Sequence, residues 1–129
     1  MRYSPDEKAK MDEILKAFQP YISSSAAFDI AAAPKLGYFF CTCYNAEENG
    51  IDVEFIDDAD SLIQALIDEI YYDVLFEGGS KNFDDRRVKA VESEVIRRVS
   101  EYTIHLPQLH PTISNLIAES AKRKLTKEH

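Results

Sequence analysis

The 129-residue sequence predicts an α+β protein, a three-stranded antiparallel meander packed with four helices in the order α-β-β-β-α-α-α. The stretch from Ile51 to Gly79 combines a strand pattern, a helix start signal, an amphipathic helix and a glycine stop. The aromatic run from Tyr38 to Tyr44 is typical of a strand. Strand patterns and helix patterns occupy separate parts of the chain, which favours an α+β arrangement over alternating βαβ units.

The stretch from Ile51 to Gly79 is expected to supply the centre of the core. Apolar residues alternate with acids at 51–55, so Ile51, Val53 and Phe55 are expected on one buried face. Short oxygen side chains at 57–61 can cap the next helix, which we place from Ser61 to Phe76 and end at Gly78-Gly79. The apolar residues that share one face of this helix are Leu62, Ile63, Leu66, Ile67, Ile70 and Val74.

The N-terminal part is expected to form one helix and two strands. Ser4 is placed to cap the first helix, Pro20 is expected to stop it, and the serines at 23–25 are expected to form a linker. A strand over 26–33 and a turn at 34–37 follow. Both faces of Tyr38–Tyr44 are apolar, which predicts a central strand that is covered on both sides, by helices or by a second subunit.

The C-terminal part is expected to be helical, with one long helix over 82–102 and a last helix from about Thr112. A narrow stripe on the long helix resembles a coiled-coil seam more than a deep core face. Its members are Val88, Val91, Val95, Val99 and Tyr102. We expect a single domain over 1–129, made of an N-terminal helix and linker (1–24), the meander plus central helix (25–79) and a C-terminal helical pair (80–129).

Composition narrows the functional classes. The net charge of −8 argues against a general nucleic-acid binder. Residues 1–80 hold 16 acidic and 5 basic side chains, and residues 81–129 hold 7 and 10, so the front is acidic and the back mildly basic. No apolar run approaches the ~20 residues of a membrane span, and the N-terminus has no secretory pattern. Two cysteines are too few for a disulfide framework, which favours a cytoplasmic location.

Three groups of residues could carry chemistry, and each has a simpler explanation. Cys41 and Cys43 lack the second ligand pair that zinc needs, so they are expected to be small buried residues. The acids at 47, 48, 57, 58 and 60 do not fit a calcium loop, and helix capping explains the aspartates. His105 and His110 lie on a proline-bounded loop without a catalytic motif. We therefore expect no metal, no cofactor and no catalytic residue.

An aromatic pair on the central helix is a candidate partner-binding site. Tyr72 and Phe76 are four residues apart, on the side away from Ile63, Ile67 and Ile70. They are surrounded by acids, namely Asp68, Glu69 and Asp73. Exposed aromatic residues are enriched at interface hot spots. Burial under the C-terminal helices is the alternative.

The basic back of the chain is a second candidate site. The cations that could converge are Arg86, Arg97, Arg98, Lys122, Arg123 and Lys124. Such a patch would bind phosphates or an acidic partner. Glu92, Glu94 and Glu101 interrupt it, so an ordinary mixed-charge surface is the alternative.

Taken together, the sequence indicates a small acidic cytosolic protein-interaction module without catalytic activity. The expected partners are a second copy of the chain, as a homodimer, and another protein. The interpretation depends on the strand Tyr38–Tyr44, the valine stripe, and the pair Tyr72 and Phe76. Two alternatives stay open: nucleic-acid or anion binding through the basic C-terminal helices, and a small-ligand-binding protein or enzyme with a pocket beside the sheet.

Overall fold

A computed structural model describes residues 3–33, 35–45, 50–77 and 85–127, and side chains at 43–45, 50, 51, 85 and 124–127 are outside the description. The predicted α+β class and element order are confirmed. The chain divides into two compact units, Met1–Leu62 and Ile63–His129. The single domain predicted from the sequence stays a prediction.

Helix α1 (Pro5–Ser24) opens the first unit. The Ser4 hydroxyl accepts a hydrogen bond from the Glu7 N–H at 3.1 Å and Pro5 is the first helical residue, so the predicted cap is confirmed. Residues spaced by three or four positions form its buried side. These are Met11, Ile14, Phe18 and Ile22.

The prediction that Pro20 stops this helix is wrong, because α1 continues for one more turn to Ser24. A proline removes one N–H bond and crowds the preceding turn. The last turn persists with two compensating contacts. Ile22 is buried, and the Ser24 hydroxyl donates to the Tyr21 carbonyl at 2.9 Å. Ser23 and Ser24 are therefore helical rather than part of a linker.

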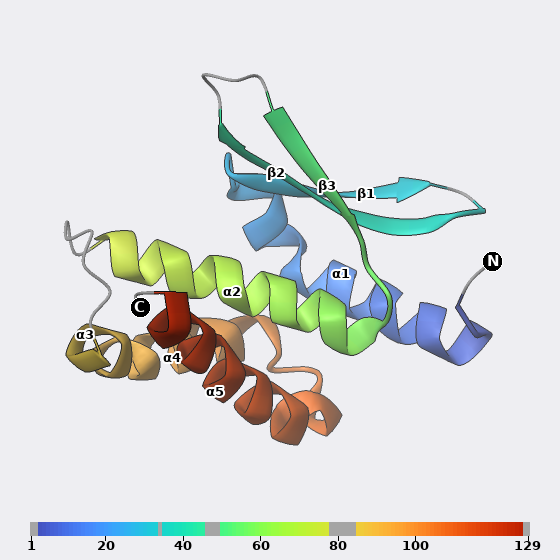
Figure 1. Ribbon diagram of the computed structural model, residues 1–129. Helices are drawn as coiled ribbons and strands as arrows, with labels where there is room; N and C mark the ends of the chain where they lie inside the picture. Colours follow the sequence, from blue (N-terminus) through green and yellow to red (C-terminus); the bar gives the residue numbers. More distant parts are fainter. Residues whose placement is uncertain (1–2, 34, 46–49, 78–84, 128–129) are drawn as a thin grey trace. The chain divides into compact units, whose positions relative to one another are not determined.

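The sheet is an antiparallel meander with the order β1-β2-β3 (Figure 1). Its strands are β1 (Phe28–Ala33), β2 (Gly37–Asn45) and β3 (Gly50–Phe55). Cys41 on β2 lies opposite Asp29 on one side and Val53 on the other. The central position predicted for the aromatic strand is confirmed.

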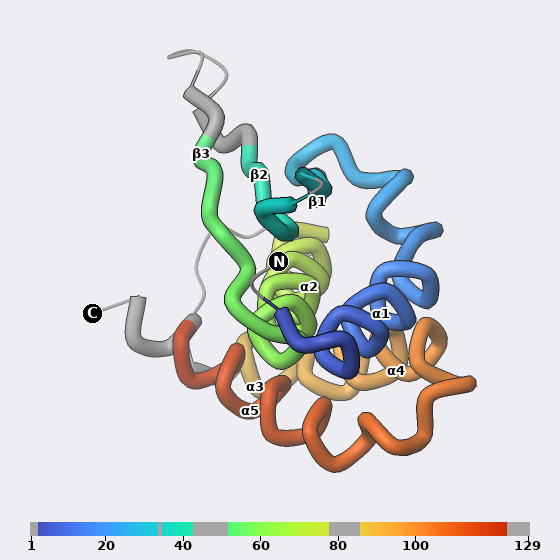
Figure 2. Tube along the Cα trace, turned by 90° about the vertical axis from the view of Figure 1, so that its right-hand side faces the viewer, coloured from blue at the N-terminus to red at the C-terminus, as the bar shows by residue number. Residues whose placement is uncertain are grey.

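Helix α1 packs on one side of this sheet, which we call the α1 side (Figures 1 and 2). The rings of Tyr21 and Phe28 are 5.6 Å apart between centroids. The Tyr38 hydroxyl donates a hydrogen bond to the Asp12 carboxylate and accepts one from the Lys8 amine at 3.3 Å. These contacts connect the C-terminal end of α1 to β1 and its N-terminal half to β2.

The same three polar groups shift one another's protonation. Hydrogen bonds from Lys8 and then Tyr38 hold the pKa of the Asp12 carboxyl below its ordinary value. Burial, followed by the bond to Asp12, raises the pKa of Tyr38. Asp12 therefore stays ionised and Tyr38 stays protonated near neutral pH.

Tyr3 connects the N-terminal segment to the end of the sheet. Its hydroxyl donates to the Ile56 carbonyl at 2.6 Å and accepts from the Tyr38 N–H at 3.1 Å. Its ring stacks on Phe55, with centroids 5.9 Å apart, and on Tyr38 at 6.0 Å. One buried side chain thereby holds the start of β2 beside the end of β3.

Gly37 is the residue that this arrangement requires. Its φ of +133° lies in a region that side chains disfavour. A Cβ atom built there would lie 2.7 Å from the Tyr3 hydroxyl oxygen and 2.8 Å from Cε1 of Phe55. Only a glycine leaves space for the Tyr3 ring at this corner.

The start of helix α2 (Ala59–Glu77) is fixed from two directions. The Asp58 carboxylate accepts from the Ser61 N–H at 2.8 Å, which confirms the predicted capping role for Asp58. The Ala59 N–H donates to the Glu7 carboxylate of α1 at 2.6 Å. Negative charge at this helix start also suits the helix dipole.

The second unit contains most of α2 and the C-terminal helices. These are α3 (Asp85–Ala90), α4 (Glu92–Tyr102), the 3₁₀ turn η2 (Pro107–Leu109) and α5 (His110–Lys127). The six core residues predicted on α2 are all buried. Tyr71 is also buried, and its hydroxyl donates to the Val88 carbonyl at 2.6 Å.

The single long helix predicted over 82–102 is interrupted at Val91, with 82–84 outside the described residues. Val91 adopts φ −90° and ψ −4°, which departs from regular helix geometry, and valine is a weak helix former. The valine stripe is core rather than an open seam. Val88, Val95 and Val99 are fully buried.

A buried polar chain joins α2 to α5. The Gln64 amide donates to the Ser120 hydroxyl at 2.6 Å, and Ser120 donates to the Asp68 carboxylate at 2.5 Å. Arg123 reaches the other Asp68 oxygen at 3.3 Å. Ser120 is fully buried, and its hydroxyl both accepts and donates a hydrogen bond within the protein.

Within the described part of the chain, none of the helices has the length and apolar character that crossing a membrane requires.

Replacing Tyr3 with Phe is expected to destabilise the fold more than replacing Tyr38 with Phe. Tyr3→Phe leaves the Tyr38 N–H and the Ile56 carbonyl without this buried partner, which costs about 1–3 kcal/mol. Tyr38→Phe leaves Lys8 and Asp12 paired with each other at 2.8 Å and in reach of water, so its cost is about 1 kcal/mol or less. Urea unfolding of both variants measures the order. An equal or reversed order would contradict the role assigned to Tyr3.

Candidate functional site

The side of the sheet opposite α1, which we call the open face, contains an exposed apolar residue, Val53. The cross-strand register places on this face Asp29, Ala31, Ala33, Gly37, Phe39, Cys41, Val53 and Phe55. Val53 is 60% exposed, while Phe39 and Cys41 are half-buried. On the α1 side, by contrast, Phe28 and Thr42 are buried.

The structure corrects the burial predicted for β3 and β2. Val53 was expected on a buried face but is exposed, Phe55 is only half-buried, and the Ile51 side chain is outside the described residues. The alternating pattern puts Val53 and Asp52 on opposite sides of the sheet, but it does not determine which side packs against a helix. On β2, Tyr38 and Thr42 of the α1 side are buried, whereas Phe40 on that side and Phe39 and Cys41 on the open face are half-buried.

The apolar side chains of the open face are two aromatic rings, a thiol and an aliphatic group. The rings of Phe39 and Phe55 meet edge to face, with centroids 5.5 Å apart. Cys41 is a free thiol beside them, and Val53 adds an aliphatic surface on the edge strand. Contact with another apolar surface would remove these side chains from water and lower the free energy.

One carboxylate lies on this face and two lie on the other side of the sheet. Asp29 pairs with Cys41 on the open face, whereas Asp52 and Glu54 of β3 pair with Thr42 and Phe40 on the α1 side, and all three acids are exposed. Residues 36–80 of the sequence contain 11 acidic side chains and no lysine or arginine. The stretch of sequence that contains β2 and β3 is therefore strongly acidic.

The structure separates the residues of the predicted aromatic site on α2. The rings of Tyr72 and Phe76 are stacked, with centroids 6.0 Å apart; Phe76 is 54% exposed and Tyr72 is half-buried. Among the acids expected to surround them, Glu69 is buried, Asp73 is half-buried and Asp68 is bonded to Ser120 and Arg123. Phe76 is thus the exposed member, and the role of this site stays a prediction.

The predicted basic patch is largely neutralised by acids. Arg97 bonds to Glu94 at 2.7 Å and to Glu101. Arg98 bonds to Glu77 at 2.5 Å and to Glu94 at 2.8 Å.

The other members of the patch differ in their surroundings. Arg123 bonds to Asp68 and lies 3.9 Å from Glu119. Arg86 and Lys122 are exposed, and the Lys124 side chain is outside the described residues. Arg97, Arg98 and Arg123 could bind a ligand only in competition with their carboxylate partners, and phosphate binding stays a prediction.

The groups considered for metal or catalytic chemistry have structural contacts. Cys41 is half-buried on the open face, and the Cys43 side chain and the acids at 47 and 48 are outside the described residues. His105 is exposed, and the ring Nε2 of His110 lies 3.4 Å from the Thr103 carbonyl. Among the described residues, no group of three or more His, Cys, Asp or Glu side chains is placed to hold a metal ion.

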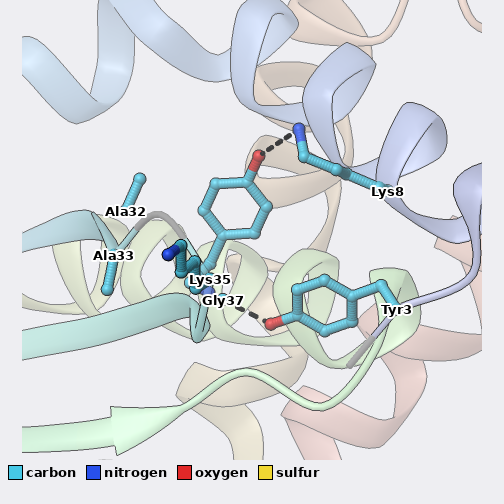
Figure 3. Close-up of a pocket in the computed structure, with 7 residues that line it drawn as sticks. Tyr3, Lys8, Ala32, Ala33, Lys35 and Gly37 are labelled. Atoms are coloured by element: carbon cyan, nitrogen blue, oxygen red, sulfur yellow. Dashed lines mark hydrogen bonds between the residues drawn. The ribbon is translucent and has the colours of Figure 1, made fainter. Parts of the chain in front are cut away.

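A cavity of about 150 Å³ lies beside the sheet, at the corner that Tyr3 closes (Figure 3). Its lining includes Tyr3, Lys8, Ala32, Ala33, Lys35 and Tyr38. The Lys8 amine is already bonded to the Tyr38 hydroxyl and to Asp12, which offsets its charge. The cavity is also smaller than the roughly 300–1,000 Å³ of ordinary small-ligand sites.

The open face as a surface is what sequence reasoning missed. Val53 and Phe55 were assigned to the core because strand alternation usually places apolar residues inward. Alternation alone does not indicate which side of a strand is exposed.

No protein-family model matches the chain, and comparisons with curated proteins and with solved structures gave no match either. The functional argument therefore depends on the geometry described above.

The carboxylate of Glu94 is expected to titrate far below its ordinary value of 4.5. Hydrogen bonds from Arg97 and then Arg98 lower its pKa to about 2. Because this pKa is depressed in the folded state, the stabilisation is complete above the ordinary value and is lost as the pH falls towards 2. Carbon-detected NMR measures the midpoint.

Arg98→Gln should raise the Glu94 midpoint, and it should also raise that of Glu77, whose pKa is lowered mainly by Arg98. Arg86→Gln is the matched control, because Arg86 is exposed and outside these ion pairs. A wild-type midpoint near 4.5 would contradict the ion-pair network.

Proposed function

We propose that the chain is a small acidic protein-interaction module without catalytic activity, which acts in the cytoplasm and contacts its partner through the open face. The observation that carries the proposal is the exposed apolar sheet surface, on which Val53 is 60% exposed beside the half-buried Phe39 and Cys41. Contiguous exposed apolar surface is typical of interaction sites. The free thiol of Cys41 and the low cysteine content support the cytoplasmic location.

Two kinds of partner fit this proposal: a second copy of the chain, as a homodimer, or another protein. The valine stripe offers no support for a homodimer, because three of its valines are fully buried. Phe76, at 54% exposure on the second unit, provides a candidate contact in addition to the open face.

The two alternative functions have weaker support. Nucleic-acid binding would need Arg97 and Arg98 to leave their carboxylate partners. A ligand-binding or catalytic role would need the small cavity beside Tyr3, where Lys8 is already paired with Asp12.

Site-specific photo-crosslinking in living cells tests the proposal. A benzophenone amino acid replaces Val53 on the open face or Asn115, an exposed residue of α5 that serves as the control. Irradiation is expected to give a discrete covalent adduct from position 53 and none from position 115. Mass spectrometry of the adduct distinguishes a second copy from another protein.

A second variant confirms that the contact is apolar. With the benzophenone at Ala31, on the same face, Val53→Lys should abolish the adduct while far-UV circular dichroism stays unchanged. An exposed substitution of this kind changes stability by about 0.5 kcal/mol or less. No adduct from positions 53 and 31, or the same adducts from position 115, would refute the proposal.

A further inference from the structure

The cavity beside Tyr3 has walls that are mostly apolar (Figure 3). Tyr38 lines it, and the cross-strand partner of Tyr38 on β1 is Ala32, whose single methyl group leaves space beside the aromatic ring. Ala33 and Gly37 also line the cavity without a larger side chain. Aromatic and small aliphatic groups therefore form most of its surface.

Most of the polar groups in this lining already have partners. The Tyr3 hydroxyl donates to the Ile56 carbonyl and accepts from the Tyr38 N–H. The Tyr38 hydroxyl donates to Asp12, and the Lys8 amine donates to both of them. The two tyrosines therefore present their rings to the cavity, and the charge of Lys8 is balanced by Asp12.

Lys35 adds a second positive charge to the lining. Its side chain is exposed. In the part of the chain that the structure describes, Lys35 takes part in no ion pair. One positive charge at the cavity is therefore not balanced by a carboxylate of these residues.

The backbone of Lys35 is a further reason to consider this side chain functional. Lys35 lies in the turn between β1 and β2, and its φ is +110°. A residue with a Cβ atom adopts this region only at a cost in free energy, whereas glycine adopts it readily. Strained residues of this kind cluster at binding sites. The chain thus has a lysine where the turn alone favours glycine.

We infer that the cavity binds a small monocarboxylate with an aromatic body, whose carboxylate contacts the amine of Lys35. The body of the ligand lies against the rings of Tyr3 and Tyr38. The inference concerns a site for a small molecule and does not rest on the proposed protein-interaction function.

The size of the ligand follows from the volume of the cavity, which is about 150 Å³. An apolar cavity of roughly this volume takes up benzene, whereas ordinary ligand sites occupy roughly 300–1,000 Å³. A single ring therefore fits, and a nucleotide does not. Benzoate is the simplest molecule that combines such a ring with one carboxylate.

The charge of the ligand follows from the charges of the lining. One unbalanced ammonium group favours one carboxylate, through a charge-assisted hydrogen bond. Phosphate would bring excess negative charge close to Asp12, which stays ionised because hydrogen bonds from Lys8 and then Tyr38 lower its pKa. A cationic ligand would be repelled by Lys35.

Three ring compounds of similar shape test the inference on the isotopically labelled full chain: benzoate, benzyl alcohol and benzylamine. Amide correlation spectra recorded by NMR at constant pH and ionic strength follow the signals of Ala32, Ala33 and Gly37. Benzoate is expected to shift these signals in a saturable way. Benzyl alcohol should bind about three- to tenfold more weakly, and benzylamine and inorganic phosphate should not bind.

Charge variants identify the amine that contacts the carboxylate. Lys35→Gln should weaken benzoate binding about three- to tenfold, and Lys35→Arg should retain it, because the cation is kept. Lys16→Gln is the matched control. It removes the same charge from an exposed position of α1 outside the cavity lining and should change the affinity less than twofold.

Size variants identify the cavity itself. Ala32→Leu fills the space beside Tyr38 and should abolish benzoate binding. Ala31→Leu places the same side chain on the opposite side of β1, outside the lining, and should leave binding unchanged. Both alanines are exposed, so both variants are expected to fold, and far-UV circular dichroism checks this.

Three results would overturn the inference. They are equal affinities for benzoate and benzyl alcohol, equal weakening by Lys35→Gln and Lys16→Gln, and no saturable shift of the cavity amides up to about 10 mM benzoate. None of these measurements involves position 53. The crosslinking test of the interaction function therefore succeeds or fails independently of them.

Discussion

The hydroxyl of Tyr3 is the contact that the first unit depends on most. It bridges the backbone of Tyr38, where β2 begins, and Ile56, just beyond the end of β3. Because the ring fills the space beside Gly37, the N-terminal segment and two strands meet at one buried point. That point holds the start of β2 beside the end of β3, and the Tyr3 ring stacks on both Tyr38 and Phe55 there.

Local signals were sufficient for most of the secondary structure. Helix α2 combines a dense apolar pattern with an aspartate cap, and both predictions are confirmed. The six predicted apolar residues are buried, and the Asp58 carboxylate accepts from the Ser61 N–H. The meander followed from aromatic and alternating patterns separated by polar loops. In each case the deciding information lies within a few residues of the element itself.

The errors came from information that is distant in the sequence. Alternation in β3 defines two sides, but the degree to which each residue is covered depends on contacts that are distant in the sequence, such as the stacking of Tyr3 on Phe55. Pro20 would stop an isolated helix, yet the burial of Ile22 retains one further turn.

Ion pairs show the same division. The spacing of Glu94, Arg97 and Arg98 allows their pairing to be predicted from one helix. The ion pair between Arg98 and Glu77, which lies on another helix, cannot be predicted from such spacing.

The acids of β3 lie on an edge strand, and edge strands expose any three-stranded sheet to pairing with other chains. Its two edge strands have backbone groups that another strand could pair with, and an apolar face beside such an edge increases the hazard of aggregation. Asp52 and Glu54 counter this by repelling copies of the same acidic chain.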